Sequence, residues 1–155
     1  TWRDAESKLA GSTAITSTGA RMELLLSGVT VAREHWLVGT GWQNYPDAFR
    51  VASQERHAGP VDNIRGATSE NPHNEYLMQL SAGGLPALAL FLLWLAAPLR
   101  RASAAASDGS WEGALACVVL AFAVGCLFNS LLLDFVEGHF YAAVLAWLLA
   151  RDERG

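Results

Sequence analysis

The chain has 155 residues and a formal net charge of −4, so its length suggests one domain and its charge gives no reason to expect a nucleic-acid partner. The charges are unevenly distributed: residues 1–76 carry seven Lys or Arg and nine Asp or Glu, whereas residues 77–155 carry four and six. A charge at the centre of a bilayer costs about 3 kcal/mol, so this contrast separates a water-facing part from a lipid-facing part. Both cysteines, Cys117 and Cys126, lie in an apolar run and are interpreted as small packing residues, so they give no argument for a disulfide or a metal site.

The polar half is predicted to contain an amphipathic helix from about residue 19 to residue 35. Ser17 and Thr18 are candidate caps for its start. Apolar side chains then recur at helical spacing, namely Met22, Leu25, Leu26, Val29, Ala32 and Trp36.

The rest of the polar half contains strong turn signals. Gly39 and Gly41 allow tight backbone turns, and Pro46 can open a second short helix that continues to about His57. Residues 58–70 have no helical pattern and are expected to be irregular.

The second half contains three uncharged or nearly uncharged runs. The first, residues 77–99, would reach about 34 Å as a helix and so crosses a bilayer core of about 30 Å. Gly83, Gly84 and Pro86 lie inside it and predict a kink or a close helix contact. A second run over residues 113–133 also has spanning length, whereas the third, residues 135–150, is short for a span.

These runs predict an all-α integral membrane helical bundle with a mostly helical extracytoplasmic loop. The loop comprises residues 1–76, and the membrane part comprises residues 77–155 with helices at about 73–99, 112–133 and 135–150. Cytoplasmic loops are enriched in basic residues, so the side that carries the arginines after the first and third runs is predicted to be cytoplasmic. These are Arg100, Arg101, Arg151 and Arg154.

A histidine precedes the first apolar run in the sequence Asn71-Pro72-His73-Asn74. A cap at Asn71 and a proline at the first helical position predict that His73 lies in the opening turn of the membrane helix. The partial positive charge of a helix N-terminus disfavours a protonated imidazole, and a neutral ring suits a general base. The alternative is a histidine that only caps the helix or binds interfacial water.

Arg21 is predicted to fall in the first turn of the loop helix, where a cation is poorly placed unless an anion lies with it. A guanidinium beside free helix N–H groups is a good phosphate receptor. The alternative is a local ion pair with Glu23. Asp134 and Glu137 are interpreted as interfacial residues, with a role in the site left open.

Two stretches carry a resemblance to a known family. The run STGARMELLLSGVTVAREHWLVGTGWQNYPDAF, followed after a variable stretch by HNEYLMQLSAGGLPALALFLLWL, resembles the O-antigen ligase and polymerase family of bacterial envelope glycosyltransferases. The similarity covers most of residues 17–98, and NSLLLDFVEGHFYAAVLAWLLA fits the end of such proteins. The order of an arginine, an amphipathic helix, a Gly-x-Gly turn and a His-Asn pair before an apolar helix is specific, although each element alone is not.

The resemblance implies a multi-pass enzyme of the bacterial inner membrane whose residues 1–76 face the periplasm. Such an enzyme transfers a glycan from an undecaprenyl-pyrophosphate carrier to an acceptor hydroxyl of lipid A-core or a growing polysaccharide, with inversion and without a metal or cofactor. Its partners are the lipid-linked donor, a saccharide or lipid-linked acceptor, and membrane lipids.

The resemblance also implies roles for individual residues. Arg21 matches the family's loop arginine that contacts pyrophosphate, His73 matches its catalytic histidine, and Asn74 accompanies that histidine. The family usually has a proline where this chain has Trp36, so the turn before Gly39 is expected to differ in shape. Weaker candidates for substrate contacts are the other loop arginines, Arg33, Arg50, Arg56 and Arg65.

The chain begins with Thr1 and shows no signal-peptide pattern, so we interpret it as a segment of a longer protein. The family has about eight to nine further helices upstream, and we expect this segment alone to be inactive. A competing hypothesis is a non-enzymatic membrane protein, such as a scaffold or part of a transporter, whose loop docks a partner.

Overall fold

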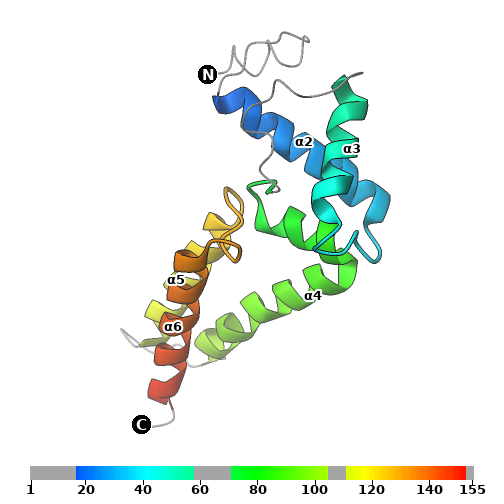
Figure 1. The fold of residues 1–155 in the computed structure, drawn as a ribbon. Coiled ribbons are helices and arrows are strands. Elements are labelled where there is room, and N and C mark those ends of the chain that lie inside the picture. The colour runs from blue at the N-terminus through cyan, green and yellow to red at the C-terminus, as the bar shows by residue number, and fades with distance from the viewer. Residues whose placement is uncertain (1–16, 58–70, 105–110, 153–155) are drawn as a thin grey trace.

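The computed structural model describes residues 17–57, 71–104 and 111–152. Over these ranges every regular element is a helix, as predicted for an all-α fold (Figure 1). The helices in chain order are α2 (Ser17–His35), α3 (Tyr45–His57), α4 (Glu75–Ala104), α5 (Trp111–Gly125) and α6 (Phe135–Asp152). Helices α2 and α3 pack on each other and α2 packs on α4, whereas the later part of the chain brings α5 against α4 and α6.

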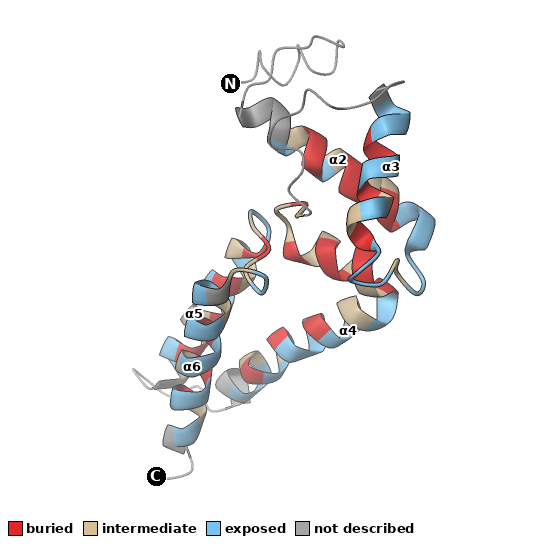
Figure 2. Ribbon diagram, viewed as in Figure 1, coloured by how far each residue is buried: buried red, intermediate tan, exposed pale blue. Residues whose placement is uncertain are grey.

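Two hydrophobic clusters hold the helices together, and α4 contributes to both. The loop cluster lies between α2, α3 and the first part of α4, and comprises Leu24, Val31, Tyr45, Phe49, Ala52, Met78 and Ala82. The bundle cluster lies between the second part of α4, α5 and α6, and comprises Phe91, Leu95, Leu115, Val119, Phe122, Cys126, Tyr141, Leu145 and Leu148. Figure 2 shows the buried residues of both groups on facing sides of the helices.

The two parts of α4 meet at a kink at Gly84, which has a φ of 67°. Pro86 has no N–H and so cannot bond the carbonyl of Ala82, and the kink separates the Leu85 N–H from the Ser81 carbonyl. The loop after α2 satisfies these groups. The N–H of Thr40 donates to Ser81 O (2.9 Å) and that of Gly41 to Ala82 O (2.8 Å), while the Leu85 N–H donates to Trp36 O (2.8 Å). The predicted kink is therefore confirmed, and the close contact beside it is made by the loop backbone and not by another helix.

This contact explains why glycine is needed in the loop. Gly39 has a φ of 77°, in the left-handed region that favours glycine. A Cβ added there would also lie 2.3 Å from the Ala82 carbonyl oxygen. At Gly84, an added Cβ would lie 2.5 Å from the backbone of Val38. Both glycines are therefore required by the same backbone-to-backbone contact.

One helix of the described part of the chain, Glu75–Arg101 within α4, is long and apolar enough to cross a membrane. The apolar stretches of α5 and α6, Glu112–Gly125 and Val136–Ala150, are shorter. The run at 113–133, expected to be one continuous spanning helix, ends its helix at Gly125 and continues as turns through residue 134. Directly after this end, the carbonyl of Cys126 accepts a hydrogen bond from the Glu75 N–H (2.8 Å), so this segment packs on the start of α4.

The outer faces of the later helices are apolar. Side chains that point away from the bundle cluster include Leu90, Leu93, Leu120, Val124, Val136, Phe140 and Trp147. An exposed apolar surface of this extent is typical of a protein face that contacts lipid or further helices.

We predict that Gly39→Ala destabilises the full-length protein by about 1–3 kcal/mol, because alanine is strained at positive φ, and the clash with Ala82 O adds to that cost. Gly113→Ala is the matched control, since an added Cβ there meets no atom within 4 Å. The melting temperature of each variant is measured in detergent, with size-exclusion chromatography used to monitor the folded fraction after heating. Equal melting temperatures for the two variants would contradict the proposed importance of the loop contact.

Candidate active site

His73 lies in the short connection that leads into α4. Its backbone N–H donates to Asn71 Oδ1 (2.8 Å), and its φ of 51° is outside the helical region. Helix α4 begins at Glu75, and Asn74 caps it by accepting the Leu77 N–H at Oδ1 (2.9 Å). The expectation that Asn71 is the cap and that His73 lies in the opening turn was therefore wrong. An Asx turn at Asn71 holds His73 just before the helix instead.

The side chain of His73 contacts a residue of the connection between α5 and α6. Its Nδ1 lies 2.9 Å from Oδ1 of Asn129, and the Nδ2 of Asn129 donates to Oδ2 of Asp134. Asn129 and Asp134 belong to the connection between α5 and α6. The ring is therefore oriented by a tertiary contact, and it stays partly exposed.

Asn74 and Glu75 attach this connection to the start of α4. Asn74 Nδ2 donates to Leu127 O (3.1 Å). Glu75 is fully buried, and its carboxylate accepts the Leu132 N–H (3.0 Å) and the amide of Gln79 (2.8 Å). A carboxylate is stabilised by the partial positive charge of a helix N-terminus, so this buried acid is well placed.

Glu75 was not identified from the sequence, although a usable signal existed. It is an acidic residue in the first turn of an apolar helix, directly after the His-Asn pair. A first-turn acid is ordinary on a surface helix. Only the packing of residues 126–134 over the start of α4 makes it a buried link between the two halves of the site.

Arg21 is exposed and lies in the second turn of α2, because this helix begins at Ser17. Its predicted position in the first turn was therefore wrong by two residues, about half a turn. Gly28 lies seven residues later, which is about 10 Å along the same face of the helix. That face touches the site, because a Cβ added to Gly28 would lie 3.0 Å from Pro72 Cβ, next to His73.

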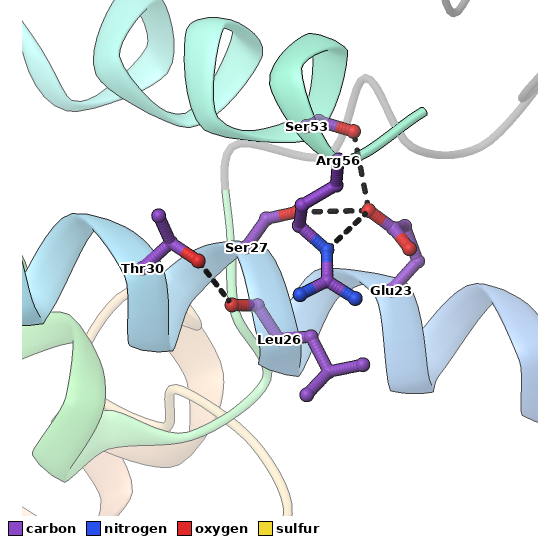
Figure 3. A network of polar contacts seen from close by, with 6 residues as sticks. All are labelled: Glu23, Leu26, Ser27, Thr30, Ser53 and Arg56. Carbon is purple, nitrogen blue, oxygen red and sulfur yellow. Dashed lines mark hydrogen bonds and ion pairs between the residues drawn. The ribbon is translucent and has the colours of Figure 1, made fainter. Parts of the chain in front are cut away.

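Glu23, the acidic neighbour of Arg21, points into the interface between α2 and α3 (Figure 3). Its Oε1 accepts hydrogen bonds from Ser27 Oγ (2.9 Å) and Ser53 Oγ (3.3 Å), and Arg56 Nε lies 3.6 Å away. This buried group ties the two loop helices together. Arg56, one of the weaker candidates for substrate contacts, therefore has a structural partner.

Two of the remaining arginine candidates lie on the surface of the loop helices. Arg33 is exposed in the last turn of α2, and Arg50 is exposed on α3 and pairs with Asp47 (2.8 Å). Arg65 lies outside the described residues. Within the described ranges, no three His, Cys, Asp or Glu side chains gather in a way that could hold a metal ion.

The fold and site define an all-α membrane protein with a polar site where a helical loop meets the start of a spanning helix. A family model described as O-antigen ligase matches residues 2–92, more than half of the chain. The chain therefore belongs to the O-antigen ligase family, as the resemblance indicated. No curated protein and no solved structure matches the chain. The matched stretch includes Arg21, the kink and His73, whereas Asn129 and Asp134 lie beyond it.

Proposed function

We propose that the protein is a membrane glycosyltransferase that moves a glycan from an undecaprenyl-pyrophosphate carrier to an acceptor hydroxyl. The observation that carries this proposal is the state of His73: one ring nitrogen is occupied by Asn129, while the ring stays partly exposed. A backbone φ of 51° in a non-glycine residue is a strained conformation of the kind that persists at functional sites. The second ring nitrogen remains for a substrate.

The proposed reaction is a direct displacement with inversion. The acceptor oxygen attacks the anomeric carbon as its proton passes to His73. The bond between that carbon and the pyrophosphate oxygen breaks, and the lipid pyrophosphate leaves with the electron pair. The leaving group is a weak base, so the enzyme mainly has to stabilise negative charge, and no metal or cofactor is required in this proposal.

Arg21 is the first choice for stabilising that charge. Arg21 lies seven residues before Gly28, whose face of α2 packs against Pro72, and this supports a place for its guanidinium on the same side of the loop as His73. A guanidinium can bind two pyrophosphate oxygens at once and stays charged. Asn74 supports the site by capping α4, and Arg33, Arg50 and Arg65 are secondary candidates for contacts with the glycan or carrier.

The proposed location is the bacterial inner membrane, with a multi-pass arrangement and residues 1–76 in the periplasm. The start of α4 and the connection between α5 and α6 contact each other, which fits three helices that cross in alternating directions. Arg100 and Arg101 follow the apolar part of α4 and support a cytoplasmic position for its end. The donor, the acceptor and the lipids would then meet at the periplasmic surface.

The proposed orientation can be tested by cysteine labelling in intact cells. Native Cys117 and Cys126 are first changed to Ala. A cysteine at Gln43, which is exposed in the loop, should react with a membrane-impermeant thiol reagent, whereas a cysteine at Ala102 should react only after the cells are permeabilised. The reverse pattern would invert the proposed topology.

We predict that Arg21→Lys in the full-length protein lowers glycan transfer at least tenfold, because lysine keeps the charge but cannot make the planar two-point contact. Arg101→Lys is the control, since Arg101 lies in the last turn of α4, at the end of that helix away from His73. Transfer is measured from a purified lipid-linked donor to its acceptor. Equal activity of the two variants would remove Arg21 from the donor site.

We predict that His73→Ala lowers transfer about 100-fold to 10,000-fold, the usual loss when a general base is removed. The side chain is partly exposed and precedes the helix, so the protein should still reach the membrane at a normal level. His35→Ala, at an exposed site at the end of α2, should remain active. An active His73→Ala protein would refute the base assignment and favour a scaffold role for the loop.

A further inference from the structure

The hydrogen bonds around His73 determine which ring nitrogen carries the proton. Asp134 accepts at Oδ2 from the side-chain amide of Asn129. An ionised carboxylate can only accept hydrogen bonds, so the NH₂ group of Asn129 must face Asp134. The carbonyl oxygen of Asn129 then faces the ring of His73, as the 2.9 Å contact to Nδ1 requires.

An amide oxygen also accepts only, so the group opposite it must be a donor. The proton of neutral His73 is therefore held on Nδ1, and the lone pair is on Nε2. This is the tautomer that a base needs if the acceptor alcohol approaches from the side of the ring opposite Asn129. An orienting partner on one imidazole nitrogen is a general way to prepare the other nitrogen for proton transfer.

We propose that Asn129 and Asp134 are positioning residues that fix the tautomer and the orientation of His73. This inference rests on the proposed role of His73 as the base. Asp134 acts through Asn129. Its carboxylate fixes the orientation of the Asn129 amide, and the amide oxygen fixes the orientation and tautomer of the His73 ring.

Backbone hydrogen bonds hold the α5–α6 connection, which contains Asn129 and Asp134, against the ends of both helices. The N–H of Asn129 donates to Gly125 O (3.1 Å), which continues the end of α5, and the N–H of Asp134 donates to Ser130 O (3.3 Å). The N–H of Gly138 donates to Asp134 O (3.0 Å), which joins Asp134 to the start of α6. Together with the contacts of Asn74 and Glu75, these bonds give the two side chains a defined place beside His73.

The test uses the full-length enzyme with two variants at these positions. Asn129→Leu keeps approximate side-chain size but removes the acceptor for Nδ1–H, and it should lower the rate of transfer about 100-fold. The double variant Asn129→Asp with Asp134→Asn exchanges the two groups. Its carboxylate at position 129 accepts from Nδ1–H and from the new amide, so the tautomer is retained and the rate should recover at least tenfold over Asn129→Leu.

The pH dependence of the double variant is the second readout. A carboxylate directly beside Nδ1–H stabilises the imidazolium, so the ring protonates at higher pH and the acid limb of the pH–rate profile should move to higher pH. The other titratable groups on the segments packed here include Glu75 and Cys126, which are the same in wild type and variant. A shift between the two proteins therefore reports the exchange at position 129.

The outcomes separate this inference from the proposed function. Activity in His73→Ala would refute the base and with it this inference. An inactive His73→Ala protein with a fully active Asn129→Leu protein would refute the positioning role alone. Loss in Asn129→Leu with neither recovery nor a pH shift in the double variant would show a merely structural role. If Asn129→Leu fails to accumulate in the membrane, the pH profile of the double variant decides.

Discussion

The arrangement of the whole chain depends on the contact between the loop at residues 36–41 and the kink of α4. Pro86 and the conformation of Gly84 leave two carbonyls and one N–H of α4 without helical partners, and the loop backbone satisfies all three. An unpaired backbone group in an apolar environment costs several kcal/mol, so neither the kink nor the loop is stable without the other. The contact therefore fixes where the polar loop sits on the membrane helix.

The kink also determines what surrounds the site. The part of α4 before Gly84 packs beneath α2 and α3 in the loop cluster, and the part after it packs against α5 in the bundle cluster. The N-terminal end of α4 is thereby placed between α2 on one side and the connection after α5 on the other. His73, at that end, is reached by groups from both halves of the chain.

Buried polar groups join the elements at the points where apolar packing alone would leave them free to slide. Between α2 and α3, Glu23 accepts hydrogen bonds from the hydroxyls of Ser27 and Ser53 and pairs with Arg56. Glu75 accepts a hydrogen bond from the α5–α6 connection and so joins it to α4. Removing one partner from such a group leaves a buried charge uncompensated, so these contacts specify geometry strongly. A proton-transfer site benefits because its ring must be held within narrow limits of position and angle.

The sequence by itself determined the helices and the kink, since α2 follows from the spacing of its apolar residues and the break in α4 follows from Gly84 and Pro86. These features depend on backbone rules that act within a few residues. The tertiary structure alone decided the partners of His73, because Asn129 and Asp134 lie more than fifty residues away in the sequence and no local pattern links them to His73. It also decided that α5 ends at Gly125 within an uncharged run, and that the Glu75 N–H at the start of α4 donates to the carbonyl of Cys126, a contact between distant segments that no local pattern encodes.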